Sequence, residues 1–207
     1  MHLEIFGSED KRLPIIRNYV EKAYNKKYIG WSSEFDSKFD SQAICFVIYD
    51  QNLIVATSKL IFNRDQSNNF LSVKYAQSSN FDLRNYKIVC EGTGLWYSNK
   101  IFLEPLWYAM FKWLDHYTSG VCLSLFDRKN KNIAKGNMEI LRFAPIDDAR
   151  IVFQDIQTVD RLPVIWTPAI QDQCSRRESI NKFSCINLLT NSHLRFEPPT
   201  FITSHYG

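Results

Sequence analysis

The sequence lacks most of the features that would identify a protein class at once. No two of its five cysteines have the two-residue spacing of a metal or redox pair, and its four histidines are scattered along the 207 residues. Isolated cysteines in apolar segments are typical of cores in a reducing compartment, so we expect neither disulfides nor a metal site. The scattered histidines also argue against a zinc enzyme or a histidine-based catalytic triad. A formal net charge of +3 is too small to indicate nucleic-acid binding.

Long apolar runs are missing as well. No segment reaches about 18 uninterrupted apolar residues, which is the length that a membrane-spanning helix needs. Residues 1–6 lack the basic stretch and following apolar run that mark a signal peptide. These absences predict a soluble, cytoplasmic protein without a membrane span.

The composition that remains is that of an ordinary globular protein, with 45% apolar and 23% charged residues. We expect one domain over residues 1–207, with a core at about 12–167 and a C-terminal extension at 171–207. The aromatic share of 14% is high. It fits either an enzyme with a long apolar pocket or simply an aromatic-rich core.

The chain is organised around a strand–helix–strand unit. Residues 86–97 form an apolar, β-branched segment typical of a strand, residues 102–117 have an apolar stripe at helical spacing, and residues 121–126 form a second apolar strand. Such a unit brings its two strands together in parallel and buries them.

Two glycines, Gly92 and Gly94, interrupt the first of these strands. Paired glycines in a strand indicate a bulge or a place where another molecule approaches the backbone closely. A carboxylate, Glu91, precedes them. Because buried parallel strands have no structural use for a carboxylate, Glu91 is the first candidate functional residue.

The flanking segments predict a mixed sheet. Upstream, the periodicity predicts one helix and three antiparallel strands, at residues 12–28, 43–49, 53–62 and 70–76. Arg17 falls on the side of that helix opposite its apolar stripe, and an acidic loop at 34–40 separates the helix from the first strand. Downstream, a basic helix, two pairing strands and a short helix are predicted at residues 128–141, 149–154, 162–166 and 179–189.

This order of elements resembles that of the GNAT acyltransferase superfamily over about residues 12–167. The resemblance implies an α+β fold (an α/β sandwich) whose mixed, mostly antiparallel central sheet is flanked by helices. Two parallel strands of that sheet, here 86–97 and 121–127, splay apart, and the pantetheine of the acyl donor lies in the gap.

The donor is indicated by a departure from the superfamily. Its usual phosphate loop, Arg/Gln-x-x-Gly-x-Gly/Ala, should fall near residues 97–103, where this sequence reads Tyr-Ser-Asn-Lys-Ile-Phe-Leu without a glycine. A diphosphate needs closely approaching backbone amides, which glycine permits. The resemblance therefore favours acyl carrier protein, whose acyl-phosphopantetheine carries one phosphate, over coenzyme A, and implies no tightly bound cofactor.

Within the superfamily, the chain is similar to the acyl-homoserine-lactone synthases and the N-acyl amino acid synthases. Trp31 precedes an acidic segment that contains Asp36 and Asp40, as in the lactone synthases. Glu91 and Thr93 match their glutamate and serine. Lys59 and Gly94 replace two arginines of that family. The loss of the arginine at Gly94 favours a free amino acid over S-adenosylmethionine as the amine acceptor, although both remain open.

The resemblance assigns roles to these positions. Glu91 would deprotonate the amine, unless it only pairs with Lys59, and backbone amides freed at the glycines would stabilise the oxyanion. Catalytic roles are implied for Glu91, Thr93 and Tyr97, the last as the acid for the thiolate. Substrate-binding roles are implied for Trp31, Asp36, Asp40, Lys59, Gly92, Gly94, Leu95, Trp96, Phe102, Trp107, Phe111 and Phe126. The two aspartates, as exposed loop carboxylates, could instead be solvated or capping residues, and the helical aromatics could be core rather than an acyl tunnel.

A basic rim is predicted where the donor enters. Acyl carrier proteins are acidic, so a rim of cations would speed encounter, although such a run can also be plain solvated charge. The rim consists of Lys100, Arg128, Lys129, Lys131 and Lys135. The sequence thus predicts an acyl-carrier-protein-dependent N-acyltransferase, with a coenzyme-A-dependent GNAT acetyltransferase and a non-catalytic binding module as the two alternatives.

Overall fold

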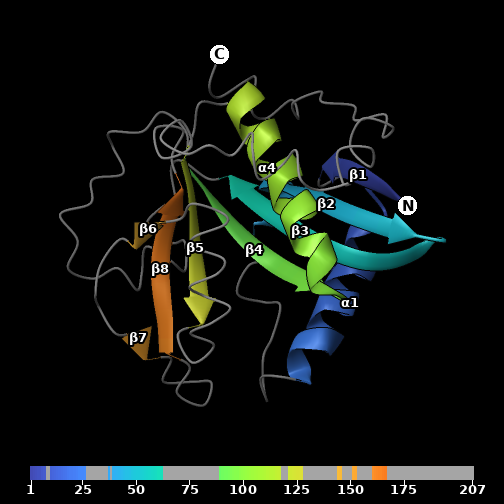
Figure 1. The fold of residues 1–207 in the computed structure, drawn as a ribbon, viewed down its shortest axis with the longest axis horizontal. Helices are drawn as coiled ribbons and strands as arrows, with labels where there is room; N and C mark the ends of the chain where they lie inside the picture. The colour runs from blue at the N-terminus through green and yellow to red at the C-terminus, as the bar shows by residue number, and fades with distance from the viewer. Residues whose placement is uncertain are drawn as a thin grey trace.

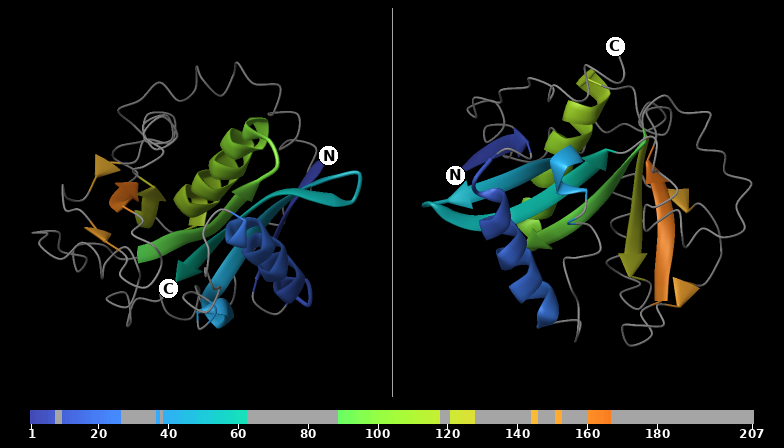
Figure 2. Two further views of the ribbon diagram at one scale, coloured as in Figure 1. Left: turned by 90° about the horizontal axis from the view of Figure 1, so that it is seen from below. Right: turned by 180° about the vertical axis from the view of Figure 1, so that it is seen from behind.

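One mixed sheet with a helix packed on each face forms the described part of the protein (Figure 1, Figure 2). The computed structural model describes residues 1–7, 10–26, 37, 39–62, 89–117, 121–127, 144–145, 151–152 and 160–166. The strands are β1 (His2–Gly7), β2 (Ala43–Asp50), β3 (Leu53–Phe62), β4 (Val89–Tyr97), β5 (Val121–Asp127), β6 (Ala144–Pro145), β7 (Ile151–Val152) and β8 (Asp160–Trp166).

The strand order is β1-β2-β3-β4-β5-β8-β6, and β7 also pairs with β8. Among the described strands the β4–β5 pair is parallel and the others are antiparallel. The predicted mixed sheet with one parallel pair is therefore confirmed, as is the pairing of the two strands near residues 150 and 164. The strand predicted at 70–76 and the helices predicted at 128–141 and 179–189 lie outside the described residues.

The parallel pair is short. Val89, Cys90 and Glu91 of β4 pair with Val121, Cys122 and Leu123 of β5. Beyond Glu91 both strands continue, β4 to Tyr97 and β5 to Asp127, while they diverge from each other (Figure 1). The predicted splay is present, and Glu91 lies at the last paired position before it.

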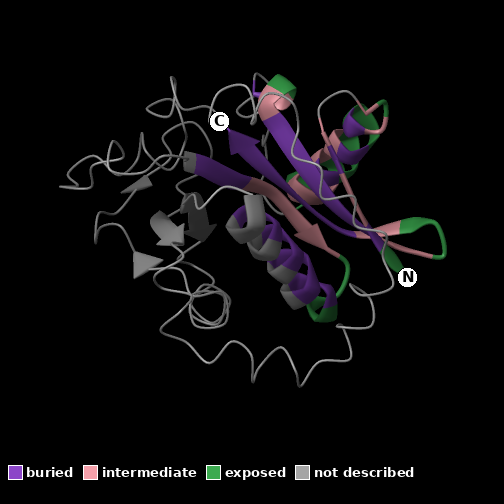
Figure 3. Ribbon diagram, turned by 90° about the horizontal axis from the view of Figure 1, so that it is seen from above, coloured by how far each residue is buried: buried purple, intermediate pink, exposed green. Residues whose placement is uncertain are grey.

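Helix α4 (Leu103–Tyr117) covers one face of the sheet, as predicted. Its apolar residues recur at three- and four-residue spacing, which aligns them along one side of a helix. That side packs on Phe46 and Phe62, whose rings contact Trp113 edge-on at centroid distances of 6.2 and 5.9 Å. Figure 3 shows the buried residues gathered on the sheet and on the side of α4 that faces it. Each fully buried large side chain contributes about 1.5–3 kcal/mol, so this layer is the main source of stability.

Helix α1 (Leu13–Asn25) covers the opposite face. Leu13, Ile16 and Val20 are buried there against β1 and β2. Arg17 is four residues after Leu13 and three before Val20, so it shares their side of the helix. The prediction that Arg17 points away from the apolar stripe is therefore wrong.

Strand β1 is not among the predicted elements. It forms the edge of the sheet next to β2, with Leu3 opposite Ile48 and Ile5 opposite Phe46. The alternation of apolar and polar residues over positions 2–5 was a usable but short signal. The hairpin between β2 and β3 is confirmed: Gln51 and Asn52 both have positive φ, 48° and 66°, as a tight two-residue turn requires.

No helix among the described residues is long and apolar enough to cross a membrane. The described residues also contain no group of three or more histidine, cysteine, aspartate or glutamate side chains that could hold a metal ion.

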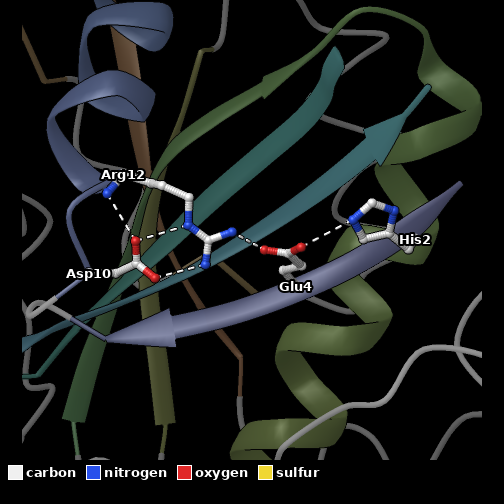
Figure 4. A network of polar contacts seen from close by, with 4 residues as sticks. All are labelled: His2, Glu4, Asp10 and Arg12. Carbon is white, nitrogen blue, oxygen red and sulfur yellow. Dashed lines mark hydrogen bonds and ion pairs between the residues drawn. The ribbon is translucent and has the colours of Figure 1, made fainter. Parts of the chain in front are cut away.

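A polar network fastens β1 to the start of α1 (Figure 4). Arg12 donates from Nε and Nη2 to Asp10 at 2.9 and 2.7 Å and also pairs with Glu4, which contacts His2 at 3.1 Å. The Arg12 guanidinium lies 4.5 Å from the centre of the Phe6 ring. The hydrogen bonds from Arg12 lower the pKa of the Asp10 carboxyl below its ordinary value.

We predict that this network makes the fold sensitive to acid through Asp10. A carboxyl whose pKa is lowered by folding stabilises the native state above its unfolded pKa of about 4 and loses that contribution as the pH falls through the lower folded value. Asp10→Asn should therefore have a lower free energy of unfolding than the wild type at pH 7, and the difference should shrink below about pH 4. Urea titrations over pH 3–7 measure it, and a difference that stays constant down to pH 3 would contradict the prediction.

Candidate active site

A β-bulge divides β4 in two. Thr57 of β3 lies opposite Trp96, whereas Lys59 lies opposite Thr93, so Ser58 alone faces both Gly94 and Leu95. Gly94 has φ +62°, the left-handed conformation that glycine adopts without strain. The predicted interruption of the strand is thus a bulge with a left-handed glycine in its first position.

The bulge changes which side chains of β4 share a face. Without it, residues 91, 93, 95 and 97 would all point the same way, because side chains alternate along a strand. With it, Trp96 joins Thr93 and Glu91 on the α1 face, opposite Thr57 of β3. Leu95 and Tyr97 instead pack against the core cluster under α4. The structure therefore brings Glu91 and Thr93 together on one face and places the side chain of Tyr97 on the other.

Glu91 is a buried carboxylate with only 6% of its surface exposed. It is paired with Ile61 of β3 on one side and with Leu123 of β5 on the other, at the last position before the parallel strands diverge. A strand that is hydrogen-bonded on both sides holds its side chain in a fixed place. Glu91 is therefore fixed on the α1 face at the start of the splay.

A buried ionic cluster lies on the same face. Lys59 Nζ is 2.9 Å from Asp40 Oδ1, and Arg17 of α1 pairs with Asp40 Oδ2. The side chains of Lys59, Asp40 and Arg17 are 10%, 13% and 32% exposed. One carboxylate thus faces two cations, which offsets the cost of burying each charge.

Asp40 is not the exposed loop carboxylate that the sequence predicts. It begins the 3-10 helix η1 (Asp40–Gln42), just before β2 and after the buried Phe39. Phe39 beside it is buried, and the Asp40 carboxylate pairs with Lys59. Sequence reasoning also missed Arg17 as a member of this cluster, although its spacing from Leu13 and Val20 was the signal for it.

The remaining predicted site residues are placed as follows. Phe102 and Trp107 are 8% and 1% exposed and belong to the core under α4. The ring of Trp96 contacts that of Tyr19 in α1 edge-on, with the ring centroids 4.8 Å apart. Gly92 is buried in β4 opposite Leu60. Lys100 is exposed at the start of the 3-10 helix η4 (Lys100–Phe102). The acyl tunnel stays a prediction.

Several predicted residues lie outside the described part of the structure. These are Trp31, Asp36, Arg128, Lys129, Lys131 and Lys135. Phe111 and Phe126 lie in α4 and β5, and their side chains also fall outside the description. The basic rim is represented here by Lys100 alone.

Comparisons with known proteins identify the fold. No protein-family model matches the sequence, and no curated protein sequence matches it. Among solved structures, the N-acyl amino acid synthase FeeM from uncultured soil microbes superposes with a TM-score of 0.60 at 13% identity, over 84% of this chain and 99% of FeeM. The coenzyme-A-dependent acyl-homoserine lactone synthase BjaI gives a TM-score of 0.58 at 10% identity, over 87% of this chain and 89% of BjaI.

An N-acetyltransferase from Staphylococcus aureus Mu50 is also similar, with a TM-score of 0.57 at 12% identity, over 81% of this chain and 98% of that protein. The predicted GNAT-like α+β fold is therefore confirmed. At these identities the likeness extends to the fold, and the chemistry has to be argued from the residues.

We predict that the left-handed conformation, and not steric crowding, makes glycine necessary at position 94. A Cβ built on Gly94 would meet only the Lys59 Cβ at 3.8 Å, an ordinary contact. Gly94→Ala should therefore be destabilised only by the strain of a positive φ, by about 1 kcal/mol. The matched control is Gly7→Ala, where a Cβ meets nothing within 4 Å and φ is not positive. Urea unfolding of both variants measures the difference, and equal losses at the two positions would contradict it.

Proposed function

We propose that the protein is an N-acyltransferase that moves a fatty acyl group from acyl carrier protein to the amino group of an amino acid or amino-acid-like acceptor. The observation that carries the proposal is the position of Glu91: a buried carboxylate fixed where two parallel strands of a GNAT-like sheet begin to splay. A carboxylate is rare at a core position of this kind. A role as proton acceptor, where the gap between β4 and β5 begins, would explain the carboxylate at position 91.

The reaction joins the acceptor nitrogen to the acyl carbon and releases the pantetheine thiol. The amine must lose a proton to attack the thioester carbonyl, and Glu91 accepts that proton directly or through one water. Backbone amides of β4 stabilise the oxyanion that forms on the carbonyl. The C–S bond then breaks, its electron pair stays on sulfur, and the thiolate takes a proton.

The ionic cluster supports an acceptor with a carboxylate. Asp40 is already shared by Lys59 and Arg17, so we do not assign it direct contact with the acceptor's ammonium. It holds the two cations on the Glu91 face of the sheet. Arg17 is the more exposed cation of the two, and its planar guanidinium suits a carboxylate. Gly94, in place of the family's arginine, further favours a free amino acid over S-adenosylmethionine.

The turn before α4 supports acyl carrier protein as the donor. The Asn99 side chain accepts a hydrogen bond of 3.1 Å from the Ile101 amide, and the Phe102 amide donates to the Asn99 carbonyl, also at 3.1 Å. Amides at this helix start, where the superfamily binds a diphosphate, are thus engaged within the chain. Lys100, exposed beside them, suffices for the single phosphate of phosphopantetheine.

A coenzyme-A-dependent acyltransferase is the second candidate, favoured by the similarity to BjaI, which is described as coenzyme-A-dependent. Purified protein incubated with long-chain acyl carrier protein or acyl-coenzyme A, each with pooled amino acids and S-adenosylmethionine, separates the candidates. We expect mass spectrometry to find an N-acyl amino acid with the carrier-protein donor. If product forms only with acyl-coenzyme A, coenzyme A is the donor. If neither donor gives product, the protein is a non-catalytic binding module.

Replacement of Glu91 tests the base. Glu91→Gln keeps the shape of the side chain but cannot accept the proton, so kcat should fall by roughly 10²–10⁴-fold, the range of general-base catalysis. Glu4→Gln is the control, because Glu4 lies on β1 at the far edge of the sheet. Unchanged turnover of Glu91→Gln, with its thermal unfolding also unchanged, would remove Glu91 from the mechanism.

A further inference from the structure

One hydroxyl group reaches the splayed edge of β4 from α1. Tyr24, in the last turn of α1, donates a hydrogen bond from its phenolic oxygen to the backbone carbonyl of Leu95. Leu95 is the second residue of the bulge, and the contact is partly buried. The two residues are 71 positions apart in the chain, so the contact is made by the tertiary fold.

The direction of the Leu95 carbonyl follows from the ladder. In an antiparallel pair, hydrogen-bonded and non-bonded residue pairs alternate. The Ser98 amide donates to the Val55 carbonyl at 2.8 Å, and the register continues as Ala56 opposite Tyr97 and Thr57 opposite Trp96. The Thr57–Trp96 pair is therefore bonded, and the Trp96 amide points at β3.

The Leu95 carbonyl belongs to the same peptide unit as the Trp96 amide and so points the opposite way, from β3 toward the side of β5. Parallel pairing with β5 has already ended at Glu91, so this edge faces the gap between the diverging strands. The Tyr24 hydroxyl on that carbonyl consequently lies at the gap.

A suitable oxyanion donor is its neighbour on this edge. Tyr97 belongs to the non-bonded pair with Ala56, so its backbone amide also points away from β3. On one edge of a strand, the carbonyl of residue 95 and the amide of residue 97 are adjacent groups. A thioester whose carbonyl oxygen accepts from the Tyr97 amide would place its sulfur within reach of the phenol on the adjacent carbonyl.

We propose that the Tyr24 hydroxyl is the catalytic acid that protonates the departing thiolate. The proposal rests on the function proposed above. As the C–S bond breaks and its electron pair moves to sulfur, the phenol proton transfers to that sulfur. The proton that the amine loses, passed on through Glu91 and water, restores the phenol.

The same geometry excludes the side chain that the sequence suggests for this role. The bulge turns Tyr97 onto the other face of the sheet, where its ring packs against the core under α4. Its backbone amide remains on the edge while its phenol leaves the gap. Tyr24 then supplies the hydroxyl from the α1 side, the side on which Glu91 and Thr93 lie.

Tyr24→Phe tests the proposal with two thioester donors that carry the same acyl chain but differ in the leaving thiol. With an alkyl thioester, the pantetheine donor, we expect kcat to fall by about 10²-fold or more, because the thiolate leaves without an acid. With an aryl thioester, whose thiolate is stable without a proton, the variant should react at close to the wild-type rate. Tyr49→Phe on β2, away from the bulge, is the control and should match the wild type with both donors.

A merely structural role of Tyr24 would slow both thioesters equally, and that result would overturn the proposal, as would wild-type kinetics with the alkyl donor. Thermal unfolding of Tyr24→Phe shows whether the fold is retained. If it is not, the pH dependence of kcat in the wild type decides: a loss of rate at alkaline pH that is absent with the aryl thioester supports the acid, and identical profiles with the two donors overturn it. Failure of the wild type with both donors would instead reject the proposed function.

Discussion

The bulge at Gly94 and Leu95 is the constraint on which the site depends. One extra residue in β4 shifts the alternation, so Trp96 lies on the Glu91 face and Tyr97 on the other. The hydroxyl of Ser58, the residue opposite the bulge, donates to the Thr93 carbonyl at 3.3 Å and helps to fix the distorted backbone. The positive φ of Gly94 makes the arrangement possible without strain, so one residue without a side chain determines where its neighbours point.

Ion pairs join α1 to β3, the strand that pairs with β4. A lysine at position 59, in the middle of the sheet, would be costly to bury alone, and the Asp40 carboxylate at 2.9 Å offsets much of that cost. Asp40 comes from the segment before β2, and Arg17 from α1 pairs with it. A helix, the segment before β2 and one strand, β3, therefore share one charge cluster.

Much of the fold follows from local patterns in the sequence. Local signals predict the apolar stripe of α4, the turn at Asp50–Asn52 and the apolar runs of β2, β3 and β5. The strand–helix–strand rule then makes β4 and β5 parallel. Glu91 was identifiable because a carboxylate conflicts with its apolar surroundings. Strand β1 was not, because six residues give too few periods to distinguish a strand from an extended terminus.

The site contacts that escaped prediction are those that depend on register. Whether Tyr97 shares a face with Glu91 depends on one bulged residue, and the glycines indicate a bulge without giving its position. The contacts of Arg17 with Asp40 and of Tyr24 with Leu95 join segments far apart in the chain. No pattern within one segment predicts its contacts with a distant segment. Periodicity predicts which face of an element a residue lies on, but only the packed structure shows which residue it contacts.

The turn between β4 and α4 bears on the choice of acyl donor. Anions bind at helix starts because the first amides lack partners within the helix. Here Asn99 supplies partners to two of them, from its side chain to Ile101 and from its carbonyl to Phe102. A diphosphate would have to displace those bonds and would gain no glycine-permitted approach in return. The phosphopantetheine of the proposed carrier-protein donor carries only one phosphate. The capped turn therefore supports the carrier-protein donor that we propose.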